Sequence, residues 1–153
     1  MPTTEDGRPT IISLADIPPE QLVVLANDLR VGARIDSGRL DLVVAERDLF
    51  GTWTGHIITS TRATPGQDSL HLVSFGGQRD LTWNSYVFGT AAPGTTAVLV
   101  TGLEGAVGGE VVNGVWVIAL PQKDLAPGDI HWTFLRADGS RRTGEGTFPP
   151  AAS

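Results

Sequence analysis

The feature of this sequence that most constrains its fold is a repeated alternation of short apolar segments with turn residues. From Leu29 onward, segments rich in Val, Ile, Leu and Trp are each followed by Gly, Asn, Asp or Pro. The segments recur roughly every ten residues, a spacing typical of β-sandwiches and barrels, whereas an α/β fold needs helical periods between its strands. The sequence therefore predicts an all-β fold: an antiparallel β-sandwich, immunoglobulin-like or jelly-roll-like, or a closely related barrel.

Turn chemistry sets the boundaries of the predicted strands. Asp36-Ser37-Gly38 predicts a hairpin loop, and Asn113-Gly114 and Asp138-Gly139 are the strongest turn signals because both supply residues that accept a positive φ. The glycine-rich segment 102–109 lacks the Gly-Lys-Ser/Thr ending of a phosphate-binding loop, so we expect a loop that joins two strands. The predicted strands cover 30–35, 40–44, 52–60, 69–75, 80–88, 95–101, 110–112, 115–120, 130–137 and 142–147.

One stretch near the N-terminus, residues 16–29, fits two structures. Asp16 can cap a short helix and the two prolines that follow are tolerated in a first turn, so a short N-terminal helix is one prediction. The apolar run Leu22 to Ala26 fits a buried strand as well. The helix is favoured by a narrow margin.

Length and composition predict one domain with short disordered ends. The chain has 153 residues, within the usual range of a single domain, and 41% of them are hydrophobic. We expect residues 1–10 and 149–153 to be disordered and residues 11–148 to form a single β-sandwich domain. The absence of cysteine excludes disulfides, a cysteine nucleophile and thiolate zinc sites.

Charge and hydropathy exclude two classes of partner. The net charge is −6, the only lysine is Lys123, and the largest basic cluster is Arg141-Arg142, so nucleic-acid binding is not expected. No apolar run approaches the ~20 residues that span a bilayer, so no membrane insertion is expected. The N-terminus has no signal-peptide pattern, which leaves the compartment unknown.

The C-terminal two thirds resembles a pattern found in small β-sandwich domains of uncharacterised, often membrane-anchored actinobacterial proteins. The similar segments are 87–100, 115–121, 130–140 and the Gly51-Thr52-Trp53-Thr54 run upstream. The resemblance implies a sandwich fold and, if the chain was trimmed, an extracytoplasmic location; otherwise a cytoplasmic location is expected. It rests on turn glycines, prolines and core positions, so it carries no functional residue. The sequence departs from the pattern in lacking early cysteines and a visible anchor.

Metal and catalytic motifs are not found. His56, His71 and His131 lie on three predicted strands without the close pairing of metal-binding histidines, and no Gly-x-Ser-x-Gly motif occurs. Glu46 and Asp48 are close in sequence, and we interpret them as a solvated strand end. We expect no metal, no cofactor and no catalytic residue, although an enzyme whose residues converge only in three dimensions stays an alternative.

Aromatic residues are the best candidates for binding. Trp116 and Trp132 alternate with smaller residues in predicted strands, which indicates core positions. Trp83 and Tyr86 have polar neighbours that favour exposure, although residues three apart on a strand face opposite sides. With Trp53, they form the predicted ligand-binding set.

The function predicted from these features is that of a non-enzymatic interaction or accessory domain, which presents loops or edge strands to a protein partner. One alternative is a carbohydrate- or small-ligand-binding module that uses the exposed aromatic residues. Another is a self-assembling structural protein, because sheet edges pair readily between copies.

Overall fold

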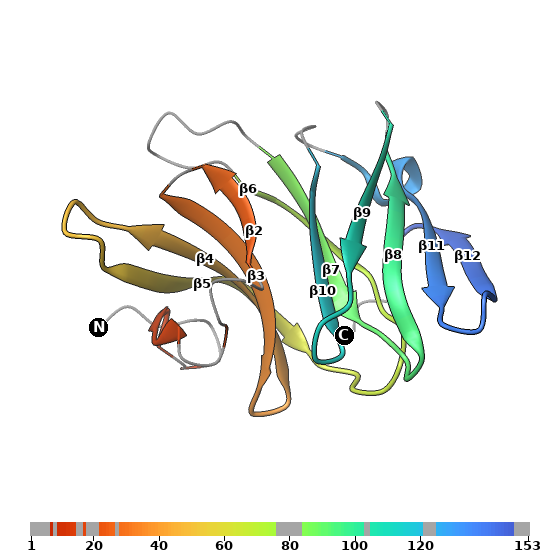
Figure 1. Cartoon of the computed structure of the whole chain (residues 1–153), viewed down its shortest axis with the longest axis horizontal. Helices are drawn as coiled ribbons and strands as arrows, with labels where there is room; N and C mark the ends of the chain where they lie inside the picture. Colours follow the sequence, from red (N-terminus) through yellow and green to blue (C-terminus); the bar gives the residue numbers. More distant parts are fainter. Residues whose placement is uncertain are drawn as a thin grey trace. The chain divides into compact units, whose positions relative to one another are not determined.

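The computed structural model describes residues 7, 9–14, 17, 22–26, 28–75, 84–102, 105–120 and 125–148 (Figure 1). Its contacts divide the chain into two compact units, residues 1–63 (unit 1) and 64–153 (unit 2). The single domain predicted over 11–148 stays a prediction. Within the described residues, no helix is long and apolar enough to cross a membrane.

Unit 1 contains one antiparallel sheet of five strands in the order β1-β5-β4-β3-β2. Its predicted hairpin is confirmed: Ser37 (φ 53°) and Gly38 (φ 76°) both take the left-handed conformation that a tight two-residue turn requires. The strands are β1 (Ile11–Ile12), β2 (Val23–Ala26), β3 (Leu29–Asp36), β4 (Arg39–Arg47) and β5 (Trp53–Arg62).

The narrowly favoured N-terminal helix is wrong for residues 23–26, which form β2. Val23 is the partner of Val31 and Val24 is the partner of Arg30 in an antiparallel ladder. The β-branched pair Val23-Val24 prefers strand geometry, and pairing with β3 provides the cross-strand contacts that decide between the two readings. Residues 18–21, where the helix would begin after Asp16, lie outside the described residues.

One face of the unit 1 sheet carries a compact apolar cluster. Two glycines make room for it: a Cβ on Gly32 would lie 2.3 Å from a Leu22 methyl carbon, and one on Gly55 would lie 2.7 Å from a Leu14 methyl carbon. Leu22 and Leu14 therefore pack directly onto the strand backbones at these glycines. The cluster consists of buried Ile17, Leu22, Val43, Ala45 and Ile57, with half-buried Ile12, Leu14 and Trp53 around it.

Unit 2 contains two antiparallel sheets, one in the order β10-β7-β6 and the other in the order β12-β11-β8-β9 (Figure 1). The described residues thus form a sandwich-like all-β fold without a closed barrel, as the sequence predicts. The elements are β6 (His71–Phe75), β7 (Asn84–Thr90), β8 (Thr95–Thr101), β9 (Ala106–Glu110), β10 (Val115–Leu120), the 3₁₀ turn η3 (Pro127–Asp129), β11 (His131–Arg136) and β12 (Arg141–Glu145).

Aromatic side chains connect the two sheets of unit 2. Trp116 on β10 meets Phe134 on β11 edge to face, with ring centroids 5.7 Å apart, and Phe134 also contacts Trp132 at 5.3 Å. Trp116 and Trp132 are 2% and 7% exposed, which confirms that both are core residues. The buried cluster comprises Leu70, Val87, Ala91, Val98, Val100, Trp116, Ile118, Leu120, Leu125, Ile130, Trp132 and Phe134.

The glycine-rich segment differs from its prediction. Residues 106–110 form β9, which pairs with β8, instead of a loop. Gly109 is required there because a Cβ would lie 2.8 Å from a side-chain carbon of Ile118. The predicted turn at Asn113-Gly114 is confirmed by φ values of 54° and 78°. It closes a single bridge between Val112 and Val115, after which the chain passes from one sheet to the other.

Candidate functional site

The most unusual surface feature of the described residues is an apolar pair in the turn between β4 and β5. Leu49 is 100% exposed and Phe50 is 93% exposed. Single exposed apolar residues are common on proteins, but two adjacent large ones that are fully exposed are a mark of interaction sites. We call the segment Asp48–Thr52 the apical turn.

The apical turn is fixed by its own hydrogen bonds. One carboxylate oxygen of Asp48, Oδ1, accepts the backbone N–H groups of Phe50 (2.8 Å) and Thr52 (3.0 Å). The Asp48 N–H donates to the Thr52 carbonyl at 3.0 Å, and the Gly51 N–H donates to the Asp48 carbonyl at 3.1 Å. Gly51 supplies the positive φ of 84° that the turn needs. Leu49 and Phe50 are therefore presented on an ordered backbone, which lowers the entropy cost of binding.

Trp53, one of the predicted ligand-binding residues, lies at the base of this turn. It is half-buried, and two guanidinium groups contact its ring: the Arg30 carbon Cζ is 4.8 Å from the ring centroid and the Arg47 Cζ is 5.5 Å from it. Arg47 is the direct cross-strand partner of Trp53, whereas Arg30 reaches the ring from β3 past the small Ala45. Two guanidinium groups therefore lie over the Trp53 ring, and the ligand-binding role of Trp53 stays a prediction.

Of the other two predicted ligand-binding residues, Tyr86 lies within the described part of the chain. Tyr86 is only 2% exposed, so the expectation that it is exposed is wrong. It lies on the central strand β7, between β6 and β10, where its position opposite Val73 and Ala119 leaves it inside the sheet. Trp83 lies outside the described residues.

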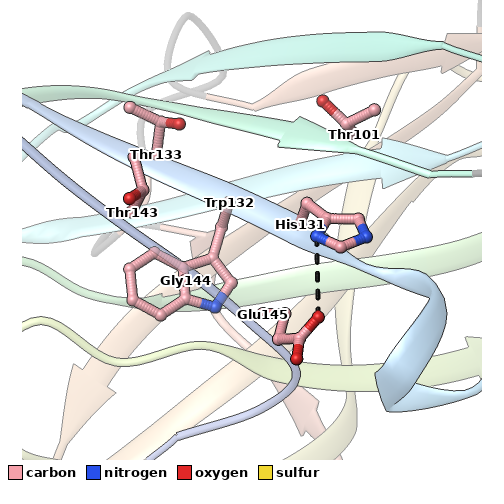
Figure 2. A pocket seen from close by; sticks show the side chains of 7 residues that line it. All are labelled: Thr101, His131, Trp132, Thr133, Thr143, Gly144 and Glu145. Carbon is pink, nitrogen blue, oxygen red and sulfur yellow. Dashed lines mark ion pairs between the residues drawn. The ribbon is translucent and has the colours of Figure 1, made fainter.

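A second surface feature is a shallow depression of about 370 Å³ on unit 2 (Figure 2). His131 and Glu145 are direct cross-strand partners, and the His131 Nδ1 lies 3.8 Å from a Glu145 carboxylate oxygen. Both side chains are exposed, at 63% and 71%. The other lining residues are Thr101, Trp132, Thr133, Thr143 and Gly144. Figure 2 shows the His131–Glu145 pair at one side of the depression and Thr133 and Thr143 at the other.

The histidines and acidic residues named from sequence form no metal centre in the described part of the chain, where no group of three or more His, Asp or Glu side chains is found. His56 lies on β5, His71 on β6 and His131 on β11. Asp48 is committed to the apical turn.

Burial perturbs the pKa of His71, which lies on β6. Its Nε2 is buried and has no hydrogen-bond partner, and its ring contacts Phe88 with centroids 5.5 Å apart. Burial lowers the pKa of His71 below its ordinary value of 6.5 because the charged form loses hydration.

We expect this burial to make unit 2 less stable in mild acid. Because the folded-state pKa is lowered, the unfolded chain binds the proton more readily; the stabilising contribution is complete above pH 6.5 and decreases as the pH falls below it. Urea unfolding at pH 7.5 and 5.5 measures the effect. His71→Leu should reduce the difference between the two midpoints, whereas His131→Leu, at an exposed position, should retain it. An unchanged difference in His71→Leu would contradict the prediction.

The strongest buried charges support the fold. The Asp68 side chain is 1% exposed. Its carboxylate accepts hydrogen bonds from both Nη atoms of Arg136, at 3.1 and 2.6 Å, and from one Nη atom of Arg142 at 3.2 Å. In unit 1 the fully buried Asp41 accepts hydrogen bonds from Arg34 (3.2 Å) and Ser60 (2.8 Å). These carboxylates accept hydrogen bonds from arginines and a hydroxyl of their own unit, which is a structural arrangement.

Sequence reasoning missed Leu49 and Phe50. The available signal was an apolar pair in Asp-Leu-Phe-Gly between two strands, at a place where turns are ordinarily polar. No protein family, curated protein or solved structure matches the chain. The resemblance to actinobacterial sandwich domains therefore stays a prediction.

Proposed function

We propose that this protein is a non-enzymatic interaction domain that binds a protein partner through the apical turn. The single observation that carries the proposal is the full exposure of Leu49 and Phe50 on a turn whose backbone is fixed by Asp48. Preorganised apolar side chains that become buried on binding are the usual energetic centres of protein interfaces.

The arrangement also explains why a partner is needed. Each of the two side chains gains roughly 1.5–3 kcal/mol when it is fully removed from water. In the free protein neither side chain gains this burial free energy, because Leu49 is 100% exposed and Phe50 is 93% exposed. A partner with an apolar pocket would supply that burial.

We expect Leu49→Asp to weaken binding to the partner at least about thirtyfold, the effect of a 2 kcal/mol interface residue. The stability of the free protein should change by less than about 0.5 kcal/mol, because Leu49 makes no buried contact. To find the partner, a photo-crosslinking amino acid is placed at position 49 and, as a control, at the exposed Glu110 on β9. The purified partner is then titrated with wild type and variant.

A crosslinked partner obtained from position 49, absent from position 110 and lost in Phe50→Asp, would support the proposal. Equal binding of the purified partner to wild type and Leu49→Asp would contradict it.

A further inference from the structure

The strand β12 lies at the edge of its sheet. It pairs with β11 on one side and is the last of the described strands on the other (Figure 1). An edge strand presents backbone N–H and C=O groups with which a further strand can pair. Arg141, Thr143 and Glu145 are all exposed. This edge can therefore accept another strand.

Hydrogen bonds at the two ends of the β11–β12 ladder show which backbone groups point away from β11. The Gly146 N–H donates to the Ile130 carbonyl at 3.0 Å, and the Arg136 N–H donates to the Ser140 carbonyl at 3.0 Å. The register between these two pairs has no shift. Hydrogen-bonded and non-hydrogen-bonded pairs alternate along an antiparallel ladder. The N–H and C=O groups that point to the open edge therefore belong to Arg141, Thr143 and Glu145.

The charges on these three residues are self-complementary. Arg141 and Glu145 each lie two residues from Thr143, on either side of it. When two copies of β12 pair antiparallel with Thr143 opposite Thr143, Arg141 of each copy lies opposite Glu145 of the other. Registers that place Arg141 opposite Arg141, or Glu145 opposite Glu145, bring like charges together, which destabilises a cross-strand pair. Charge therefore selects the register centred on Thr143, which is a two-fold, isologous contact.

Neighbouring charged groups leave this pattern in place. Successive strand residues point to opposite faces, so Arg142 lies on the other face of the sheet, where its Nη1 donates to Asp68 at 3.2 Å. The His131 Nδ1 lies 3.8 Å from the Glu145 carboxylate, but the Glu145 side chain is still 71% exposed and accessible to a further cation. Asp138, in the turn before β12, uses Oδ1 to accept an N–H and a hydroxyl of its own turn. Opposite charges thus remain exposed at the two ends of the strand.

The opposite edge of the same sheet, β9, has a different pattern. The Val111 N–H donates to the Thr96 carbonyl at 3.0 Å, so the same alternation leaves the backbone groups of residues 106, 108 and 110 pointing outward. Antiparallel pairing of two β9 strands centred on Gly108 would place Glu110 opposite Ala106, without an ion pair. Charge therefore favours β12 over β9 as the strand that pairs.

We propose that this protein forms a two-fold homodimer in which the β12 strands of two copies pair antiparallel. Thr143 lies at the two-fold axis, and Arg141 of each copy forms an ion pair with Glu145 of the other. The partner for this edge is thus a second copy of the chain, and the two four-stranded sheets become one continuous sheet. The contact does not involve the apical turn, so either proposal can fail without the other.

Sedimentation equilibrium of the full chain at roughly 1 to 500 μM tests the ion pairs. Wild type should dimerise. Arg141→Glu and Glu145→Arg should each weaken dimerisation at least about tenfold, because both ion pairs become like-charge contacts. A 1:1 mixture of the two variants should restore the dimer, since one then carries two acidic and the other two basic residues at these positions. A monomeric wild type, or a mixture that associates no better than the separate variants, would overturn the proposal.

Thr143→Pro tests the backbone pairing. The Thr143 N–H points away from β11, and proline is tolerated on an edge strand at such a position, so the fold should be kept while the dimer is lost. Gly108→Pro is the matched control at the outward-pointing centre of β9 and should dimerise like wild type, as should Leu49→Asp. A dimer that survives Thr143→Pro would overturn the proposal. Loss of the dimer in Gly108→Pro or Leu49→Asp would overturn it in favour of β9 or the apical turn.

Discussion

Asp68→Ala is expected to destabilise unit 2 by about 3 kcal/mol, because removing one partner of a buried ion pair leaves the other charge uncompensated. The Asp68 side chain is 1% exposed and that of Arg136 is 21% exposed. Asp68 also accepts the Ala92 backbone N–H at 2.9 Å. One carboxylate thus joins the segment before β6 to the start of β8 and to the β11–β12 hairpin.

The pH dependence of this residue follows from its surroundings. Burial by itself would raise the pKa of Asp68, but the hydrogen bonds from Ala92, Arg136 and Arg142 outweigh it and hold the pKa below 3.8. Since the folded-state value is lowered, the stabilising contribution is present above pH 3.8 and is lost as the pH falls further. Asp68→Ala should therefore lose less additional stability than wild type between pH 4.5 and 2.5.

Urea unfolding followed by tryptophan fluorescence in a Trp53→Phe background measures this change, because the three remaining tryptophans all belong to unit 2. Arg142→Gln is the control: its side chain is 52% exposed, so its loss should cost less than about 1 kcal/mol. If Asp68→Ala were no more destabilised than Arg142→Gln, the ion pair would not hold unit 2 together.

Phe134→Ala should cost about 3–5 kcal/mol, the range for truncating a fully buried aromatic residue. Phe134 is 0% exposed. Its ring contacts three others edge to face, with centroids 5.7 Å from Trp116, 5.3 Å from Trp132 and 5.8 Å from Phe148. The substitution leaves a cavity between the two sheets and removes the contacts that position both tryptophans.

The same unfolding experiment, with near-ultraviolet circular dichroism of the native state, measures the effect. Phe134→Leu should recover much of the lost stability because it refills most of the volume. Leu99→Ala, on the neighbouring strand β8 but 38% exposed, should cost clearly less than Phe134→Ala. Similar losses for Phe134→Ala and Leu99→Ala would show that Phe134 is not central to the core.

Local chemistry determined the parts of this protein that depend on neighbours in sequence. The turns at Ser37-Gly38, Asn113-Gly114 and 138–140 require residues that accept a positive φ or cap a backbone N–H, so their positions could be read directly. The bounds of β8 and β10 agree with their predictions residue for residue. Trp116 and Trp132 were predicted as core residues because strand alternation is itself a local pattern.

Tertiary structure decided the rest, because it depends on which strands meet. Residues 23–26 fit a helix or a strand until pairing with β3 made them β2, and 106–110 became β9 because β8 lies beside them. Tyr86 has polar neighbours in sequence, yet its place on a central strand buries it. The contacts of Arg30 and Arg47 with Trp53 could not be predicted either, because the three residues lie on three strands and only the register of β3, β4 and β5 brings their side chains to one ring. Spacing along the chain sets backbone conformation, whereas cross-strand pairing sets which side chains share a surface.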